Sequence, residues 1–326
     1  MIHSKYLISI IIPLYNESEN FEMLTSRIDS LIKEMNIEIE VVMIDDGSKD
    51  DTPLKMQAHA MNNKNYNCVF LSKNFGHQIA VTAGIHEARA TDALFIIDGD
   101  LQDPPELLKN FYELYKNGYD VVYAVRKKRK ENIIKRIAYN SFYRILNKIS
   151  TIKIPIDSGD FSLISRRVAD IMKQMPEESR FLRGMRYWIG FNQYGYEYER
   201  SERAAGTPKY TFKKLWQLAK NGIFNFSEAP VKFMKRTGYI AITLSVVYLI
   251  YILIKKLLYN SVPQGFTTLI FAFILFSGFQ FIFMGLLGEY ILRIFFQVKQ
   301  RPLFIIKNQM IEGEYKTIIY GEKEPK

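Results

Sequence analysis

Two aspartates separated by one glycine follow an apolar run in the first third of the chain. Asp98 and Asp100 flank Gly99 directly after the run Ala93 to Ile97. The glycine permits a tight turn, so both carboxylates can point into one crevice. Carboxylate oxygens suit Mg²⁺ or Mn²⁺, which proteins hold with one or two carboxylates together with substrate phosphates. The triplet therefore predicts a site for a metal-bound diphosphate.

A second carboxylate pair, Asp45 and Asp46, follows the apolar run Ile39 to Ile44. An Asp-Gly pair alone can be a simple turn signal, but carboxylates after two separate runs favour a site. Asp46 could also accept a hydrogen bond from a base or ribose, as acidic residues do in nucleotide-binding α/β sheets. Because neither Gly-x-x-x-x-Gly-Lys nor Gly-x-Gly-x-x-Gly occurs, ATPases and dinucleotide enzymes lose support.

Short apolar runs must position these carboxylates. Helix-like stretches of a dozen or more residues separate most of the runs, which is the alternation typical of an α/β fold with a mostly parallel, doubly wound sheet. Ligands of such sheets bind beyond the carboxyl ends of the strands, where the polar residues stand. The predicted strands are Leu7 to Ile12, Ile39 to Ile44, Cys68 to Leu71, Ala93 to Ile97 and Val121 to Val125.

The composition excludes several classes of protein. With 48% hydrophobic and 24% charged residues among 326, the chain has the composition of a folded domain and is not disordered. The net charge of +10 indicates nucleic acid or an anionic membrane surface, and long apolar segments favour the membrane over nucleic acid. The single cysteine, Cys68, excludes a disulfide framework and a multi-cysteine zinc site.

Amphipathic and apolar segments fill the second half. Apolar residues recur at helical spacing between Arg126 and Lys153, which predicts a basic helix lying in a headgroup layer or a helix packed on the core with a solvated face. Basic and aromatic residues are interleaved from Thr211 to Arg236. The uncharged stretches Gly238 to Ile254 and Phe266 to Leu287 predict a transmembrane helical hairpin.

Basic residues on both sides of this hairpin place its two ends in the cytoplasm. The expected organisation is a cytoplasmic catalytic domain in residues 1–210, an amphipathic juxtamembrane segment in 211–236, the hairpin in 237–290 and a cytoplasmic tail in 291–326. The protein is then a multi-pass protein of the inner (cytoplasmic) membrane. The flanking cations are Lys232, Lys235 and Arg236 before the hairpin and Arg293, Lys299 and Arg301 after it.

The polar motifs carry a resemblance to a known family. Together they resemble family 2 glycosyltransferases with the A-type nucleotide-sugar fold, and within them the polyprenyl-phosphate type that includes bactoprenol glucosyltransferases and dolichol-phosphate mannose synthases. The resemblance extends over residues 7–300. The motifs are Pro13-Leu14-Tyr15-Asn16-Glu17, Asp45-Asp46-Gly47-Ser48, Lys73-Asn74-Phe75-Gly76-His77-Gln78, Asp98-Gly99-Asp100, Gln102-Asp103-Pro104, Asp157-Ser158-Gly159-Asp160-Phe161 and Arg203 to Tyr210.

The resemblance implies roles for individual residues. Asp98 and Asp100 would hold the metal and meet the donor ribose, and Asp157 or Asp160 would orient the acceptor or the sugar, with a role as base left open. The donor-binding candidates are Pro13, Tyr15, Glu17, Asp46, Lys73 and Gln102. The candidates for binding the lipid phosphate or the diphosphate are Arg126, Arg129, Arg203 and Lys209.

The resemblance also implies the reaction. One hexose, glucose in the first instance, would move from a UDP sugar to undecaprenyl phosphate on the cytoplasmic face, for modification of a cell-surface glycan such as lipopolysaccharide. The processive Gln-x-x-Arg-Trp motif is absent, which favours single transfer. Alternatives are a GDP-mannose or amino-sugar donor, or a non-catalytic membrane scaffold. Expected partners are the nucleotide sugar, the polyprenyl phosphate and membrane lipid, with no nucleic acid; a homo-oligomer is compatible with the sequence.

Overall fold

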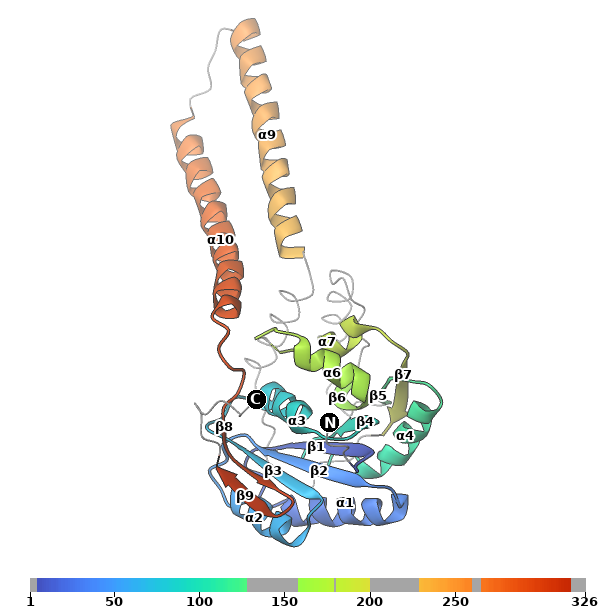
Figure 1. Ribbon diagram of the computed structural model, residues 1–326. Coiled ribbons are helices and arrows are strands. Elements are labelled where there is room, and N and C mark those ends of the chain that lie inside the picture. Colours follow the sequence, from blue (N-terminus) through green and yellow to red (C-terminus); the bar gives the residue numbers. More distant parts are fainter. Residues whose placement is uncertain (1–4, 128–157, 179, 200–228, 260–264, 318–326) are drawn as a thin grey trace, which may run out of the picture. The chain divides into compact units, whose positions relative to one another are not determined.

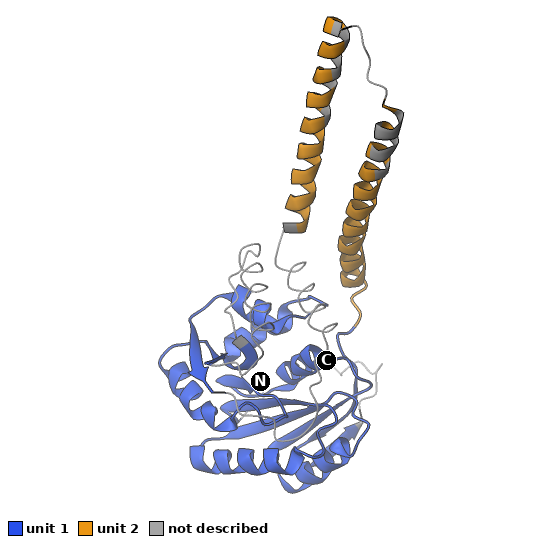
Figure 2. Ribbon diagram, turned by 180° about the vertical axis from the view of Figure 1, so that it is seen from behind, with its two compact units in different colours: residues 1–145, 152–218, 302–326 blue, residues 146–151, 219–301 orange. Residues whose placement is uncertain are grey.

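The computed structural model describes residues 5–127, 158–178, 180–199, 229–259 and 265–317 (Figure 1). The chain divides into two compact units (Figure 2). One unit comprises residues 1–145, 152–218 and 302–326, and the other comprises residues 146–151 and 219–301. Most of the predicted basic helix of residues 126–153, and most of the juxtamembrane segment 211–236, lie outside the described residues.

All five predicted apolar runs form strands of the first unit. Helices follow the first four, because the segments between the runs bring apolar residues back at helical spacing; in α1 the buried positions are Phe21, Leu24, Ile28 and Leu31. The elements are β1 (Ile8–Leu14), α1 (Phe21–Met35), β2 (Ile39–Asp45), α2 (Thr52–Asn62), β3 (Tyr66–Leu71), α3 (His77–Glu87), β4 (Ala93–Ile96), η1 (Pro105–Leu107), α4 (Leu108–Lys116) and β5 (Val121–Arg126).

The second half of the unit completes a nine-stranded sheet of order β7-β5-β6-β4-β1-β2-β3-β8-β9. Strands β3, β2, β1 and β4 run parallel, and β5 pairs parallel with β7. The remaining elements are β6 (Ser158–Ser165), α6 (Arg166–Gln174), α7 (Leu182–Ile189), β7 (Gln193–Tyr198), β8 (Ile306–Ile311) and β9 (Glu314–Thr317).

The sheet is mixed, where the sequence led us to expect a mostly parallel one. Strand β6 lies between β4 and β5 and runs antiparallel to both. At the other side, β8 follows the last long helix and pairs antiparallel with β3, and β9 returns along β8. Residues 306–317, within the segment predicted as a tail, therefore belong to this sheet.

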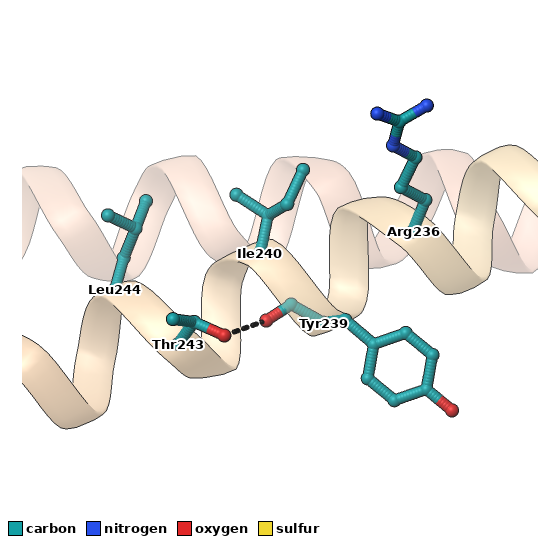
Figure 3. A pocket seen from close by; sticks show the side chains of 5 residues that line it. All are labelled: Arg236, Tyr239, Ile240, Thr243 and Leu244. Atoms are coloured by element: carbon teal, nitrogen blue, oxygen red, sulfur yellow. Dashed lines mark hydrogen bonds between the residues drawn. The ribbon is translucent and has the colours of Figure 1, made fainter.

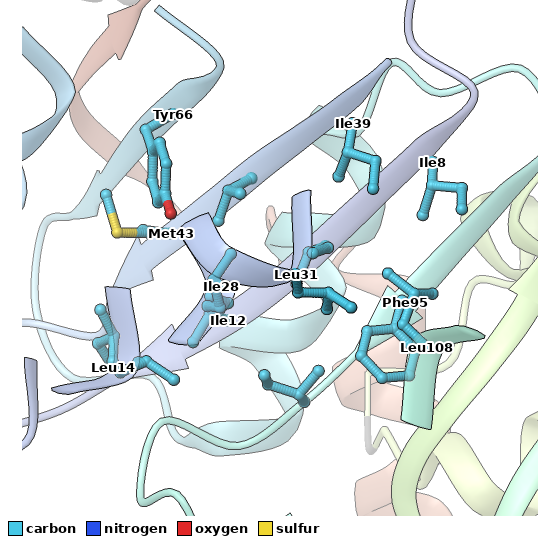
Figure 4. Close-up of a cluster of buried hydrophobic side chains, with 14 of the residues drawn as sticks. Ile8, Ile12, Leu14, Ile28, Leu31, Ile39, Met43, Tyr66, Phe95 and Leu108 are labelled. Atoms are coloured by element: carbon cyan, nitrogen blue, oxygen red, sulfur yellow. The ribbon is translucent and has the colours of Figure 1, made fainter. Parts of the chain in front are cut away.

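A cluster of buried apolar side chains joins the strands to α1, α2 and α4 on one face of the sheet. Figure 4 shows part of this core. Alternate residues of β1 point into it, because successive side chains of a strand face opposite sides. Ile8, Ile12 and Leu14 of β1 meet Ile28 and Leu31 of α1 there. This core fixes the first four strands, and so it also fixes the loops at their carboxyl ends.

Helix α3 packs on the opposite face at unusually short distance. A Cβ atom at Gly84 would lie 2.4 Å from Cγ2 of Ile11 and 2.7 Å from Cδ1 of Ile44, so a glycine is needed at this close approach. Ile11 belongs to the other set of alternate β1 side chains. The tight packing presses α3 against β1 and β2, and its first turn then stands at the carboxyl edge of the sheet.

The second unit contains two long helices, α9 (Ala229–Tyr259) and α10 (Phe266–Val298). Within the residues that the structure describes, one stretch, Leu275–Val298 of α10, is long and apolar enough to cross a membrane by length and composition. None of this stretch is buried inside the protein, unlike the core helix of a soluble domain. Residues 260–264, between the two helices, lie outside the described residues.

Candidate active site

The carboxyl ends of four parallel strands bring the predicted polar motifs to one edge of the sheet. Leu14 at the end of β1 is in register with Asp45 of β2, and Ile11 of β1 with Ile96 of β4. The loop after each of these strands therefore begins at the same edge. Asp98 follows β4 by two residues, so it lies where the sequence predicts the chemistry.

Strand β6 adds Asp160 to the same edge. Because β6 runs antiparallel to β4, Ile96 pairs with Ser162, and continuing this register by two residues sets Asp98 opposite Asp160. Two carboxylates that are 62 positions apart in the chain are thus brought to the same edge, one two residues beyond β4 and the other in β6. Asp160 is 8% exposed, whereas about a third of the Asp98 side chain reaches solvent.

His77, the first residue of α3, lies between these carboxylates. Its Nε2 donates to Oδ1 of Asp98 across 2.8 Å, since an ionised carboxylate only accepts, and its Nδ1 lies 3.9 Å from Oδ2 of Asp160. Burial disfavours the charged imidazolium, but Asp98 outweighs this effect and, with Asp160, raises the pKa of His77 to about 9. At neutral pH the ring is a cation between two anions.

Asp160 is held from a second helix as well. Arg183 of α7 donates from Nε to Oδ1 across 2.9 Å and from Nη2 to Oδ2 across 3.2 Å. Burial by itself raises the pKa of this carboxyl, but Arg183, with His77 and Arg186 nearby, outweighs burial and holds the pKa well below its ordinary value. Asp160 therefore stays ionised.

Arg186, one turn further along α7, is a buried cation. It donates to the carbonyl oxygen of Gly159 across 3.3 Å, and its guanidinium lies 5.3 Å from the centre of the Tyr123 ring. Burial lowers the pKa of Arg186 to about 10, with Asp160 opposing that shift. The Asp160 end of the site consequently carries an excess of positive charge, which suits an anionic ligand.

Asp46, a predicted donor-binding residue, contacts backbone in the loop before α3. Its Oδ1 accepts the N–H of Phe75 across 2.7 Å, and its Oδ2 accepts the N–H of Gly76 across 3.0 Å. Burial raises the pKa of Asp46, and these two hydrogen bonds oppose the rise. Next to it, Gly47 has φ +69°, and a Cβ there would lie 2.7 Å from the backbone of Lys73 and Asn74. The two loops are thereby packed directly on each other.

The other predicted donor-binding residues stand in the same strand-end loops. Pro13 is buried in β1, and Tyr15 is half-buried just after it. Glu17 accepts a hydrogen bond from the side chain of Asn20 across 2.8 Å. Lys73 is exposed, with its Nζ 5.0 Å from the centre of the Phe75 ring.

The loop beyond β4 is organised by its own carboxylates. Oδ1 of Asp100 accepts the N–H of Gln102, two residues further along the chain, across 3.2 Å. Asp103 is buried and accepts a hydrogen bond from the hydroxyl of Tyr198 in β7. Asp100 is 8% exposed, so one of the two predicted metal ligands is largely covered.

Arg126 ends β5, which runs alongside the start of β6. Its Nε is buried and has no hydrogen-bond partner among the residues that the structure describes. Nη2 lies 3.9 Å from the position that a Cβ of Gly159 would take, so the guanidinium stands beside the Asp160 loop. The other predicted residues, Asp157, Arg129, Arg203 and Lys209, lie outside the described residues.

Four residues of this site were not predicted as functional from the sequence. His77 contacts Asp98, Gln78 and Arg183 contact Asp160, and Arg186 contacts its neighbour Gly159. His77 and Gln78 belong to a motif that carried the resemblance, which was the available signal. Arg183 and Arg186 gave none, because single arginines in an amphipathic helix usually indicate a solvated face.

The donor set fits a divalent cation that completes its shell with substrate oxygens. Within the described part of the chain, no group of three or more His, Cys, Asp or Glu side chains is arranged to hold a metal by itself. Asp98 and Asp100 supply two carboxylates, which matches the habit of Mg²⁺ and Mn²⁺ of taking one or two carboxylates with phosphates. Asp98, already oriented by His77, is the more accessible of the two.

A surface hollow on α9 is a separate feature of the second unit (Figure 3). None of the strand-end residues lines it. Its walls are apolar and aromatic side chains and one threonine, with a single cation at one end. The lining residues are Arg236, Tyr239, Ile240, Thr243 and Leu244.

Comparison with known proteins identifies the family of this chain. The family described as glycosyl transferase family 2 matches residues 9–171, which include β1 to β6 and the carboxylates Asp46, Asp98, Asp100 and Asp160. The chain belongs to this family. It is a glycosyltransferase, and the resemblance seen in the motifs is confirmed.

Relatives of known name are similar over nearly the whole chain. An uncharacterized glycosyltransferase of Bacillus subtilis (strain 168) is 40% identical over 306 residues, 94% of each chain. A bactoprenol glucosyl transferase of Shigella phage SfV is 36% identical and covers 93% of this chain and 98% of its own. A prophage bactoprenol glucosyl transferase homolog of Escherichia coli (strain K12) is 35% identical and covers 92% and 98%. This glycosyltransferase is thus bactoprenol glucosyl transferase-like.

Among solved structures, glucosyl-3-phosphoglycerate synthase from Mycobacterium tuberculosis, crystallised with Mn²⁺ and UDP, superposes with a TM-score of 0.43 and 16% identity. The match covers 67% of this chain and 77% of the synthase. A likeness at this level does not bear on the donor or the metal of the glycosyltransferase described here.

Proposed function

We propose that this glycosyltransferase moves one hexose, glucose, from UDP-glucose to undecaprenyl phosphate at the cytoplasmic face of the membrane. The observation that carries the proposal is the similarity to bactoprenol glucosyl transferases over more than nine-tenths of the chain. The apolar stretch Leu275–Val298 supports a membrane location, where a polyprenyl phosphate would be found. The transmembrane hairpin, with both ends in the cytoplasm, is part of the proposal.

In the proposed reaction, Asp98 and Asp100 would hold a divalent cation, Mg²⁺ or Mn²⁺, which would supply positive charge beside the departing diphosphate. His77 orients Asp98 through the 2.8 Å hydrogen bond. The loops carrying Pro13, Tyr15, Glu17, Asp46, Lys73 and Gln102 form the donor side. Asp46 contributes by fixing the loop before α3.

The acceptor would bind beside Asp160, where positive charge is in excess. A phosphate monoester has a second pKa of about 6, so undecaprenyl phosphate is mostly a dianion at neutral pH and needs little help from a base. Arg126, whose buried Nε has no hydrogen-bond partner among the described residues, is the best suited of them to bind it. Asp160, ionised and held by Arg183, is assigned an orienting role and not that of a base. Asp157, Arg129, Arg203 and Lys209 remain candidates on this side.

The alternative donors are GDP-mannose and an amino-sugar nucleotide, because the residues that contact the sugar are not identified. The experiment is to incubate membranes containing the full-length protein with each nucleotide sugar and to analyse the extracted lipids by mass spectrometry. We expect a hexose on undecaprenyl phosphate with UDP-glucose, and none from membranes carrying Asp98→Asn. A product formed with GDP-mannose alone would show that GDP-mannose is the donor. If no donor gives a lipid product, undecaprenyl phosphate is not the acceptor.

A further inference from the structure

Gln78, the second residue of α3, connects three parts of the site. Its Nε2 donates to Oδ2 of Asp160 across 2.8 Å, and its Oε1 accepts the N–H of Leu182 across 2.9 Å. Leu182 is the first residue of α7, and it lies 104 positions away along the chain. One side chain therefore ties the first turn of α3 both to β6 and to the beginning of α7.

The orientation of this amide is fixed by chemistry. A backbone N–H can only donate, so the atom facing Leu182 must be the amide oxygen. An ionised carboxylate can only accept, so the atom facing Asp160 must be the amide nitrogen. Glutamate at this position would replace the donor with a second carboxylate beside Asp160. Methionine would keep the length of the side chain and lose both hydrogen bonds.

Gln78 and Arg183, on two different helices, both donate hydrogen bonds to the carboxylate of Asp160. Oδ2 of Asp160 accepts from Gln78 of α3 and from Arg183 of α7, while Oδ1 accepts from Nε of Arg183. With 8% of Asp160 exposed, water does little to hold this carboxylate in place. Its orientation is set by these two partners.

The neighbouring residue, His77, contacts Asp98 across 2.8 Å. Two successive residues of α3 thus reach two carboxylates: His77 contacts Asp98 beyond β4, and Gln78 contacts Asp160 in β6. Because α3 is packed tightly on the sheet at Gly84, its first turn is a rigid support for both. A shift of about 1 Å in such a support can lower turnover by as much as about 100-fold.

We propose that Gln78 is a positioning residue of the transfer reaction, acting through Asp160 and the start of α7 to hold the acceptor side in fixed geometry relative to Asp98. The inference rests on the proposed function for what the two sides bind. Gln78 itself need touch neither substrate. Its effect on turnover should therefore depend on the carboxylate that it holds.

A double-mutant cycle on the full-length protein tests this dependence. The variants are Gln78→Met, Asp160→Asn and the double variant, with Gln174→Met, at the exposed end of α6, as the matched control. The readouts are kcat, the KM for UDP-glucose, the KM for undecaprenyl phosphate, and the thermal unfolding midpoint. Endpoint mass spectrometry over hours extends the range to very slow variants.

Gln78→Met should lower kcat between about 10-fold and 100-fold, with the donor KM within about twofold of wild type. In the Asp160→Asn background it should lower kcat by less than about twofold. Gln174→Met should change none of these values. If Asp160→Asn gives no measurable product, Arg183→Lys takes its place, because it keeps the carboxylate and alters its other partner; strong non-additivity with Gln78→Met is expected there too.

An equal loss of kcat from Gln78→Met in both backgrounds would overturn the proposal, as would a lowered unfolding midpoint with unchanged kcat. Wild-type turnover with UDP-glucose and undecaprenyl phosphate reports on the proposed function alone. If that turnover is absent, the cycle is run with the donor and acceptor that the wild-type protein does use. The coupling between the two substitutions then still reports on Gln78 alone.

Discussion

Nε2 of His77 and Oδ1 of Asp98 are 2.8 Å apart, which joins the first residue of α3 to the first carboxylate beyond β4. The contact orients Asp98 before any ligand arrives, and it sets a positive charge beside the carboxylate. Preorganised charge of this kind is effective in catalysis because little reorganisation is needed as the reaction proceeds. The same contact guides the choice of substitution at Asp98.

Asp98→Asn and Asp100→Asn should each lower turnover by about 10²-fold or more while the protein stays folded. Asparagine keeps an oxygen that can accept from His77 but removes the charge that holds a divalent cation. Turnover is measured in buffers with Mg²⁺ or Mn²⁺, and folding by the thermal midpoint. Asp170→Asn, at an i,i+4 ion pair with Arg166 on α6, is the control and should retain activity. Near-normal turnover of both site variants would show that Asp98 and Asp100 do not hold a metal ion needed for transfer.

Arg126→Ala should raise the KM for undecaprenyl phosphate by about 10-fold to 100-fold, since a charge-assisted hydrogen bond contributes about 1.5 to 3 kcal/mol. The affinity for the nucleotide sugar, measured by calorimetry, should change much less. Lys127→Ala is the matched control, because the side chain of Lys127 is 59% exposed and its Nζ lies 3.9 Å from Oε2 of Glu197. If the variant instead loses affinity for the nucleotide sugar while the KM for undecaprenyl phosphate is unchanged, Arg126 binds the diphosphate of the donor and not the acceptor.

The carboxylate of Asp160 should make stability depend on pH in the acid range. Its folded pKa lies below the ordinary value of 3.8, so the ionised group stabilises the protein above about pH 4. That stabilisation is lost as the pH falls further towards the folded pKa. The thermal midpoint of the wild-type protein in detergent should therefore exceed that of Asp160→Asn at about pH 6, and the gap should narrow towards about pH 3. A gap that is constant over this range would mean that the pKa is not depressed.

Cysteine labelling tests the proposed topology. Gly265→Cys, just before α10, should react in intact cells with a reagent that cannot cross the membrane, and Lys5→Cys should react only after lysis. The native Cys68 should not react with the reagent, because it is 1% exposed and burial raises the pKa of its thiol. Equal labelling of both positions from outside would contradict the hairpin.

The first half of the fold could be predicted because its signals are local. Each apolar run of four to six residues formed a strand, and the polar motif after it was placed at the carboxyl edge without knowledge of the partner strands. Strand β6 was missed because it opens with Ser158, Gly159 and Asp160, which are typical of a loop. Strand β7 was missed because the edge strand Gln193–Tyr198 is only half-buried.

The rest of the site depends on contacts that no local pattern encodes. Gln78 meets Asp160 over a separation of 82 residues, and β8 joins β3 after two long helices have intervened. The motif containing His77 and Gln78 pointed to the site, but the roles of its members come from β6 and α7. The arginines of α7 gained importance only when the sheet register set Asp160 beside them.

Purified full-length protein, undecaprenyl phosphate and UDP-glucose with Mg²⁺ or Mn²⁺ allow the most direct test of the central claim. The quantities to measure in one reaction are the UDP released and the hexose recovered on the lipid. We expect equal amounts of both, one hexose on each modified lipid, and neither product with undecaprenol in place of its phosphate. Release of UDP without lipid-linked hexose, or more than one hexose per lipid, would contradict the proposed function.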